Sequence, residues 1–440
     1  MAGQRGITPR TRNRRGLYMT AVTVTQSQAR SRFMAVLAAS IGNALEWFDF
    51  VVYGFFALTI SKLFFPAGDD TISLLLTFIT FGVPFFMRPL GAIVLGGYAD
   101  RHGRKATLVL TIGLMLLGTA VIAVMPTYQS IGALAPLLIL IARMIQGFSA
   151  GGEFGSATAF LAEQDPKRRG FFASWQLASQ GITTVLATGF GVALSSMLTP
   201  AQMEAWGWRT PFIFGLLIGP VAYYLRQHVE EAPEFQSAQR SEAPLREAFL
   251  NDRSRMLIGL GVIVLGTVAT YMTLFMPSYA VRQLGLPPAG SFMAGLLYGV
   301  LQILLIPLFG ALSDRVGRLP IPALCAVVML FGIYPLFAWL ANVPTLQTLL
   351  CAWVILGVLV AGYQASLPAL LSELFPIHTR TTGLSISYSF GVMIFGGFAP
   401  FIVQWLIEIT GSKLAPSFYV MLAAGISIIA LAAARGAGFR

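Results

Sequence analysis

Long apolar runs separated by short polar turns occupy almost the whole chain. About twelve runs can be distinguished, and each is near the ~20 residues that a helix needs to cross a bilayer. The pattern predicts membrane-spanning helices at about 33–60, 72–98, 106–126, 133–162, 171–198, 209–227, 255–281, 290–312, 320–341, 345–372, 382–409 and 416–434. We therefore expect an all-α membrane protein with twelve transmembrane helices.

One long polar stretch divides these helices into two sets. Residues 228–254 are rich in Glu, Gln, Arg and Ser, which predicts a cytoplasmic linker between six-helix bundles at 33–227 and 255–434. A repeat supports the division, because GAIVLGGYADRHGRK (91–105) is echoed by LIPLFGALSDRVGR (305–318). Such repetition is typical of transporters built from two pseudo-symmetric bundles.

The two ends of the chain fall outside these bundles. Residues 1–32 carry several arginines without the apolar core of a signal peptide, and we predict a disordered cytoplasmic tail there. Met19 and Met34 are possible later starts. Residues 435–440 are predicted to form a short cytoplasmic tail.

Composition narrows the class of protein. Hydrophobic residues make up 56% of the chain and charged residues 11%, which is typical of a membrane protein and leaves no soluble catalytic domain. Cys325 and Cys351 both fall in apolar runs, so no disulfide is expected. A membrane-embedded enzyme or sensor is disfavoured because His102, His228 and His378 all fall at the cytoplasmic margin. We expect no enzymatic activity, no cofactor and no metal.

The net charge of +11 could indicate a nucleic-acid partner, but the positions of the basic residues indicate membrane topology instead. If the amino terminus is cytoplasmic, Lys and Arg gather in the tails and loops of that side. Only Lys62, Arg282 and Lys413 then fall on the opposite side. This positive-inside pattern predicts an inner-membrane protein with both termini in the cytoplasm and no nucleic-acid partner.

Charged residues also fall inside the predicted spans of the amino-terminal half. They are Glu46, Asp49, Arg88, Arg143 and Glu153, all within ~10 Å of the midplane at a rise of ~1.5 Å per residue. A charge in hydrocarbon costs several kcal/mol and needs a reason. A proton or an anionic ligand could neutralise such a set in alternation, which would couple proton and substrate. Alternatively, Arg143 with Glu153 and Arg88 with Asp49 form static pairs that hold helices together.

Uncharged polar residues recur at helical spacing near these charges. Gln176, Gln180 and Thr184 repeat every four residues and could face a central cavity. Two helical faces carry further candidates: Asn43, Glu46, Phe50 and Tyr53 on the first span, and Arg143, Gln146, Ala150 and Glu153 on the fourth. The candidates of the carboxyl-terminal half are Tyr271, Tyr298, Gln302, Tyr363, Gln364, Tyr388 and Gln404. Contact between helices is the alternative role for all of them.

The repeated turn is a candidate gate. Asp100, at the end of the second span, can accept hydrogen bonds from Arg104 or from a helix N-terminus, and Gly96 and Gly97 permit close helix approach. The alternative is that its basic residues only anchor the turn to the anionic inner leaflet. The gate candidates are Asp100, Arg101, Gly103, Arg104, Glu163, Asp314, Arg315, Gly317, Arg318 and Glu373.

Several motifs resemble those of one transporter family. The turn ADRHGRK resembles the loop signature of the major facilitator superfamily, and RMIQG in the fourth span resembles a second signature. GNALEWFDF, MRPLGA, QGFSAGGEFG and SELFPIHTRTTG together are similar to its metabolite-proton symporter branch, whose members carry citrate, 2-oxoglutarate, shikimate, proline and betaine. The resemblance covers roughly 32–434, and WGWRTPFIFG and FGVMIFGGFAPFI are most similar to citrate and tricarballylate carriers.

The resemblance implies roles for individual residues. Arg88 and Arg143 would bind substrate carboxylates, and Glu46, Asp49 and Glu153 would couple protons. The other implied substrate-binding residues are Gln146, Tyr53, Gln176, Gln180, Tyr298, Gln302 and Gln364.

The second copy of the charged turn departs from the family pattern. It has Leu319 and Pro320 where the first copy has Lys105 and Ala106. Its basic cluster is weaker, so the case for a gate is weaker at this copy than at the first.

These observations together predict a monomeric inner-membrane carrier that imports a small carboxylate with protons. Citrate or a related di- or tricarboxylate is favoured, because two midplane arginines can each pair bidentately with a carboxylate. The alternative is another metabolite, such as 2-oxoglutarate, shikimate, proline or betaine. Osmosensing carriers tend to have an extended helical tail, whereas only a few residues follow the last predicted span here.

Overall fold

The computed structural model describes residues 36–37, 40–41, 43–44, 47–102, 104–151, 153–227, 252–376 and 379–439. The predicted tail at 1–32 and most of the predicted linker lie outside these residues. The described parts form helices joined by short turns, with no strand among them. The prediction of an all-α protein is confirmed.

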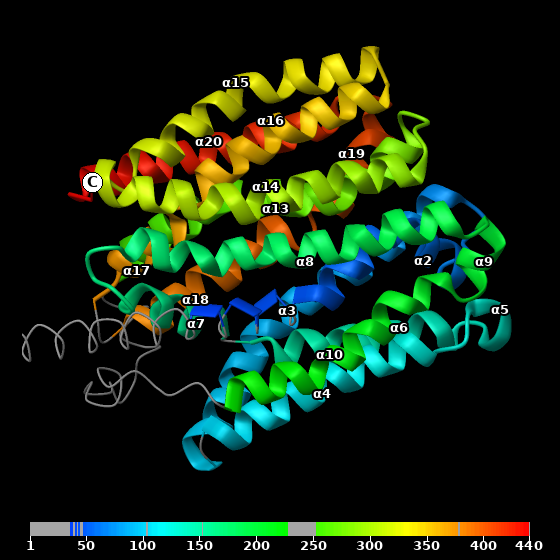
Figure 1. Cartoon of the computed structure of the whole chain (residues 1–440), viewed down its shortest axis with the longest axis horizontal. Coiled ribbons are helices and arrows are strands. Elements are labelled where there is room, and N and C mark those ends of the chain that lie inside the picture. Colours follow the sequence, from blue (N-terminus) through cyan, green and yellow to red (C-terminus); the bar gives the residue numbers. More distant parts are fainter. Residues whose placement is uncertain are drawn as a thin grey trace, which may run out of the picture.

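Most helices of the amino-terminal half lie in the lower part of Figure 1. A helical segment Trp47–Phe55 precedes α2 and is bent from it by 75° at Phe56. The elements that follow are α2 (Ala57–Phe64), α3 (Asp70–His102), α4 (Arg104–Val124), α5 (Tyr128–Ile131), α6 (Leu134–Ser149), α7 (Glu153–Glu163), α8 (Arg169–Met197), α9 (Pro200–Ala205), η1 (Gly207–Arg209) and α10 (Thr210–Gln227).

Most helices of the carboxyl-terminal half lie beside them, in the upper part of Figure 1, whereas α17 and α18 lie next to α7. They are α13 (Arg253–Arg282), α14 (Pro288–Val316), α15 (Pro320–Asn342), α16 (Leu346–Gln364), α17 (Leu367–Leu374), α18 (Arg380–Gly391), the π-helix η2 (Val392–Gly396), α19 (Ala399–Thr410) and α20 (Ala415–Gly436).

The predicted spans coincide with these helices, although some spans are broken. In the described part of the chain, eight helices are long and apolar enough to cross a membrane, and the bent pair at Phe56 makes up to nine. Two shorter apolar helices, Val109–Val124 and Leu134–Ser149, occupy further predicted spans. The predicted span 133–162 is divided between α6 and α7, and the span 345–372 between α16 and α17.

Glycines explain how closely the helices approach one another. A Cβ atom at Gly147 or Gly151 would collide with the backbone of α3 at Pro84 or Arg88. The glycine-rich segment at the end of α6 therefore serves helix packing, as small residues do in membrane helices. This contact sets the position of Arg88 relative to α6.

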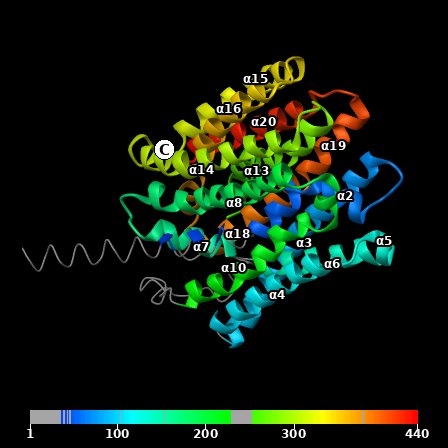
Figure 2. The same cartoon turned by 45° about the vertical axis from the view of Figure 1, so that its right-hand side comes forward.

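The two halves meet along α8 and α14, which lie side by side in both views (Figures 1 and 2). A Cβ atom at Gly181 would lie 2.8 Å from the carbonyl oxygen of Gly299, so both positions require glycine for this packing. On the other side of the molecule, a Cβ at Gly82 in α3 would lie 2.7 Å from the ring of Phe398. Two interfaces between the halves therefore flank the space between them.

Candidate functional site

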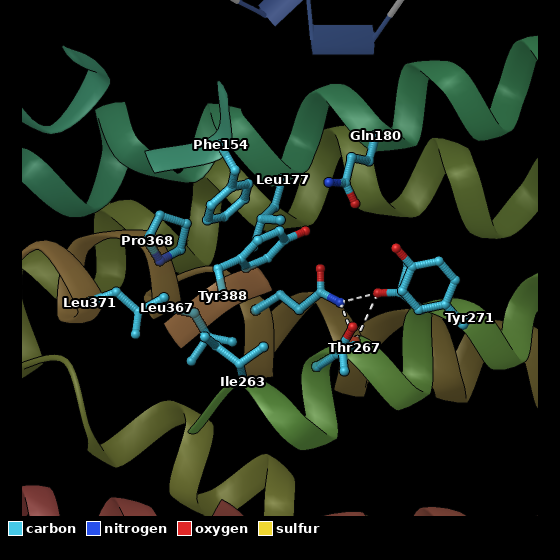
Figure 3. Close-up of a pocket in the computed structure, with 13 residues that line it drawn as sticks. Phe154, Leu177, Gln180, Ile263, Thr267, Tyr271, Leu367, Pro368, Leu371 and Tyr388 are labelled. Atoms are coloured by element: carbon cyan, nitrogen blue, oxygen red, sulfur yellow. Dashed lines mark hydrogen bonds between the residues drawn. The ribbon is translucent and has the colours of Figure 1, made fainter. Parts of the chain in front are cut away.

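Two cavities of about 420 and 520 Å3 lie between the two halves. They share Leu177 and Gln180 of α8, Thr270 and Tyr271 of α13, and Gln364 of α16. Gln180 and Tyr271 approach the smaller cavity from opposite sides (Figure 3). The described residues that line both cavities are uncharged.

Three glutamines supply much of the polarity of these cavities. The side chain of Gln364 donates to the carbonyl oxygen of Gly266 (2.9 Å) and to Thr270 Oγ1 (2.5 Å). Gln302 donates to the carbonyl oxygen of Gly357 (2.9 Å). Its own Oε1 and the Nε2 of Gln180 have no hydrogen-bond partner in the described part of the chain. These two groups can bind a polar ligand, because buried polar atoms are normally hydrogen-bonded.

The structure separates the sequence candidates on α8. Gln180 and Thr184 line the larger cavity, as does Tyr298 from α14. Gln176 does not line either one: its Nε2 donates to Asn43 Oδ1 (3.0 Å), and Asn43 Nδ2 donates to the carbonyl oxygen of Gln176 (3.0 Å). This reciprocal pair joins α8 to the first span, which is the packing role that membrane amides often have.

A buried chain of hydrogen bonds connects Arg143 to Asp49. Arg143 Nη1 donates to Gln146 Oε1 (2.9 Å), and Gln146 Nε2 donates to Thr119 Oγ1 (3.1 Å). The Thr119 hydroxyl in turn donates to Asp49 Oδ2. Three helices of the amino-terminal half therefore hold a cation and a carboxylate at the two ends of one chain.

Thr119 is the member of this chain that sequence reasoning missed. A threonine within an apolar span is common and carries no charge that would mark it. The only local signal is the preceding Gly118, where a Cβ would lie 2.6 Å from Gln146 Cγ. Close approach of α4 and α6 at this glycine brings the Thr119 hydroxyl to the Gln146 amide.

Aromatic rings surround both buried arginines. The Cζ atom of Arg143 lies 4.6 Å from the ring centroids of Phe50 and Tyr53. The Cζ atom of Arg88 lies 4.5 Å from the ring of Trp47 and 5.2 Å from that of Phe50. Cation–π contacts of this kind stabilise a desolvated guanidinium. Nε of Arg88, and Nε and Nη2 of Arg143, have no hydrogen-bond partner among the described residues.

Of the two static pairs considered from the sequence, only Arg88 with Asp49 has both side chains among the described residues. Arg88 and Asp49 form no salt bridge in the described structure, where Asp49 binds Thr119 instead. Glu153 begins α7, but its side chain is outside the described parts, as is the whole of Glu46. The predicted set of acids is therefore represented by Asp49 alone among the described side chains.

The second copy of the repeated turn connects the two halves. The backbone N–H groups of Gly170 and Phe171, at the start of α8, donate to Asp314 Oδ1 (2.7 Å) and Oδ2 (3.0 Å). Arg318 Nη1 also donates to Asp314 Oδ1 (2.7 Å), and Arg318 Nε donates to Glu373 Oε1 (3.1 Å). A carboxylate at a helix N-terminus is favoured by the unpaired amides and by the helix dipole.

Other gate candidates have different surroundings. Glu163 at the end of α7 lies 3.5 Å from Arg380 at the start of α18, and this salt bridge connects the two halves. Arg315 is exposed, and Gly317 ends α14 with a φ of +98°, which favours glycine. In the first copy, the side chains of Asp100, Arg101 and Arg104 and all of Gly103 lie outside the described residues.

These features define a membrane carrier: two helical halves meet at charged turns and enclose a cavity beside buried charges. The chain belongs to the Major Facilitator Superfamily, whose family model matches residues 33–337 and 291–436. The predicted family and fold are confirmed. The family consists of transporters, so the prediction that the chain is not an enzyme is also confirmed, and the chain is a multi-pass membrane protein.

Individual relatives are similar over nearly the whole chain. A citrate-proton symporter of Klebsiella pneumoniae is 39% identical, and the match covers 91% of this chain and 91% of that protein. A proline/betaine transporter of Escherichia coli is 34% identical over 90% of this chain and 82% of its own length. The solved structure of a proton:xylose symporter has a TM-score of 0.74 at 16% identity, covering 92% of this chain and 95% of that one, which supports the fold alone.

Proposed function

We propose that the protein imports a small carboxylate together with protons, with citrate or a related di- or tricarboxylate as the favoured substrate. The observation that carries this proposal is the hydrogen-bonded chain from Arg143 through Gln146 and Thr119 to Asp49. It places a cation with unpartnered donors and a carboxylate in one buried network. The similarity to a citrate-proton symporter supports the same substrate class.

The two ends of this chain suit different ligands. A substrate carboxylate can accept the free donors of Arg143 and Arg88, forming charge-assisted hydrogen bonds that neutral solutes do not form. Asp49 is 5% exposed, and an ionised carboxylate there costs several kcal/mol, so a proton stabilises it. Substrate and proton together would neutralise the site before the carrier changes conformation. Glu46 and Glu153 remain candidates for further proton sites.

The cavity between the halves is the proposed path. Gln180, Tyr298, Gln302 and Gln364 contact the substrate in this scheme. The halves at 33–227 and 255–434 would tilt about this cavity, as the repeated bundles of such carriers do. The contacts of Asp314 and Glu163 would form the inner gate, which faces the cytoplasm together with both termini. We propose a monomer in the inner membrane, with no nucleic-acid partner.

A second candidate function is import of a zwitterionic solute such as proline or betaine. It is favoured by the neutral, aromatic lining of both cavities among the described residues and by the similarity to a proline/betaine transporter. 2-Oxoglutarate and shikimate are further carboxylates that the arginines could bind. The two functions differ in whether the substrate must reach Arg143.

Uptake into proteoliposomes under an imposed pH gradient distinguishes these functions. Labelled citrate, 2-oxoglutarate, shikimate, proline and betaine are compared in wild type and in Arg143→Ala. We expect citrate accumulation in the wild type and none in Arg143→Ala, with equal amounts of folded protein. Arg435→Ala is the matched control, because Arg435 is exposed and lies outside the proposed site and gate, so this variant should leave uptake unchanged. Accumulation of proline or betaine alone would contradict the carboxylate proposal.

A further inference from the structure

The ring of Phe50 lies between the cavity and the two buried arginines. Phe50 and Trp47 line the larger cavity, whereas neither arginine is among the described residues lining the two cavities. Both guanidinium groups also contact the Phe50 ring. Their Cζ atoms lie 4.6 Å (Arg143) and 5.2 Å (Arg88) from its centroid. A ligand in the cavity therefore meets Phe50 or Trp47 before it meets either cation, and Phe50 is the one of these two rings that contacts both arginines.

The arginines keep a capacity for binding that the ring does not use. Arg143 is 0% exposed and Arg88 is 6% exposed. Water therefore supplies few hydrogen bonds to their guanidinium groups. An aromatic face attracts a cation but accepts no directed N–H bond of the kind that a carboxylate accepts. The unpartnered Nε atoms of both arginines, and Nη2 of Arg143, are therefore free to donate to an anion.

We propose that Phe50 is a movable screen that decides which ligands reach the arginines. In the conformation described here the ring covers both cations. When the ring turns aside, the arginines lose its cation–π contacts. A carboxylate would compensate for this loss by accepting charge-assisted hydrogen bonds from the guanidinium groups, whereas a neutral solute forms no such bonds. Phe50 is thus a positioning residue that selects for anions, and this inference rests on the proposed anionic substrate.

The surroundings of Phe50 allow this movement. Its neighbours include the ring of Phe85 and the ring of Trp47, which also lines the larger cavity, with centroids 6.0 and 5.9 Å away. Phe50 itself borders the same cavity. Each arginine also keeps a second ring when Phe50 leaves, because Arg88 contacts Trp47 and Arg143 contacts Tyr53.

Chemical labelling of the arginines tests the screen without relying on transport. Purified full-length protein is treated with phenylglyoxal, and modification of Arg88 and Arg143 is followed by mass spectrometry, with exposed Arg315 as the internal standard. We expect both buried arginines to react about tenfold faster in Phe50→Ala than in wild type, a difference of ~1.4 kcal/mol. Citrate should slow the reaction in that variant by occupying the guanidinium groups.

Phe48→Ala is the matched control. Phe48 lies on the same helix and is also 1% exposed, but its ring packs on Phe190 and Phe214, at 6.3 and 5.6 Å. It should leave labelling at the wild-type rate. Phe50→Val provides a second test if Phe50→Ala does not fold, since valine is apolar but leaves part of the space of the ring empty, and a smaller acceleration in the same direction is expected.

The outcomes separate the screen from the proposed function. Labelling in both Phe50 variants at the rate of Phe48→Ala would overturn the screen, even if citrate is transported. A third outcome is faster labelling together with uptake of betaine but of no di- or tricarboxylate. The Phe50 ring would then still cover the arginines, but selection for anions and the proposed substrate would both be overturned. Faster labelling with citrate protection and citrate uptake supports both.

Discussion

The rings of Phe154 in α7 and Tyr388 in α18 are stacked face to face, with centroids 3.4 Å apart and planes 4° from parallel (Figure 3). Phe154 belongs to the amino-terminal half and Tyr388 to the carboxyl-terminal half. Both line the smaller cavity. The pair therefore joins the halves at one end of the proposed path, on the side where Glu163 contacts Arg380.

Removing one ring of this pair should loosen that end of the carrier. An aromatic pair contributes ~0.5–1.5 kcal/mol beyond its buried area, so Phe154→Ala should raise the open population about two- to tenfold. A cysteine at Leu371, which lines the same cavity, reports this population through its rate of reaction with a water-soluble maleimide. Cys325 and Cys351 are replaced by serine beforehand. Phe154→Tyr keeps the ring and should react at the parent rate, and equal rates in all variants would refute the expectation.

The contact of Asp314 with α8 should also control uptake. Asp314→Asn keeps the shape of the side chain but removes the charge that binds Arg318 and the amides of Gly170 and Phe171. Hydrogen bonds to charged groups contribute ~1.5–3 kcal/mol, so we expect the maximal uptake rate to fall about tenfold or more. Arg435→Gln changes an exposed charge outside the proposed gate and should have little effect. Normal uptake by Asp314→Asn would remove this contact from the transport cycle.

The sequence predicted the spans well because apolar length alone identifies them. It did not predict the break at Phe56, which lies within an apolar run and depends on how neighbouring helices pack. The break at Ala365 was also not predicted, although Pro368 in the first turn of α17 is a local signal for it. Asp49, Arg88 and Arg143 were found because charges are rare in such runs. The separation of Arg88 and Arg143 from the cavity by Phe50 was not predictable, because it depends on side-chain packing across several helices.

The contacts of the second charged turn depend on more than its basic residues. The departure at Leu319 and Pro320 weakened the sequence argument for a gate there, because that argument counted basic residues. The structure shows Asp314 bound by two backbone N–H groups of α8, and backbone donors cannot be read from composition. Leu319 is 6% exposed and Pro320 occupies the first turn of α15, so both have local structural roles.

Arg209 should stabilise the fold rather than bind substrate. Its Nη1 and Nη2 donate to the carbonyl oxygens of Ala123 (2.7 Å) and Met125 (2.8 Å), at the end of α4. Arg209→Ala leaves these acceptors unpaired, and we expect a loss of about 1–3 kcal/mol of stability, measured as a lower melting temperature. Lys62→Ala removes an exposed ion pair with Glu204 and should change the melting temperature little. Equal melting temperatures for the two variants would contradict this role.

Asp69 should not contribute to the pH dependence of uptake. The backbone N–H groups of Ile72 and Thr71 donate to its carboxylate and lower its pKa from the ordinary value of 3.8. Because the pKa is lowered, the contribution of Asp69 to folding stability is fully present above pH 3.8. It is lost only as the pH falls through the lower pKa of the folded state. Between about pH 5 and 8 the group does not titrate. Asp69→Asn, which still caps α3, should therefore keep the wild-type pH profile of uptake, and a shifted profile would contradict this assignment.

Asp49 should, by contrast, determine whether uptake is driven by protons. Asn at this position can still accept the hydrogen bond from Thr119, so the buried chain to Gln146 and Arg143 should persist. Because Asn is neutral and takes up no proton, we expect Asp49→Asn to lose accumulation under a pH gradient while it still exchanges internal for external substrate. Thr119→Ser keeps the hydroxyl and should accumulate substrate normally. Both activities are measured in the same proteoliposomes, and accumulation by Asp49→Asn at the wild-type level would assign the coupled proton to another residue.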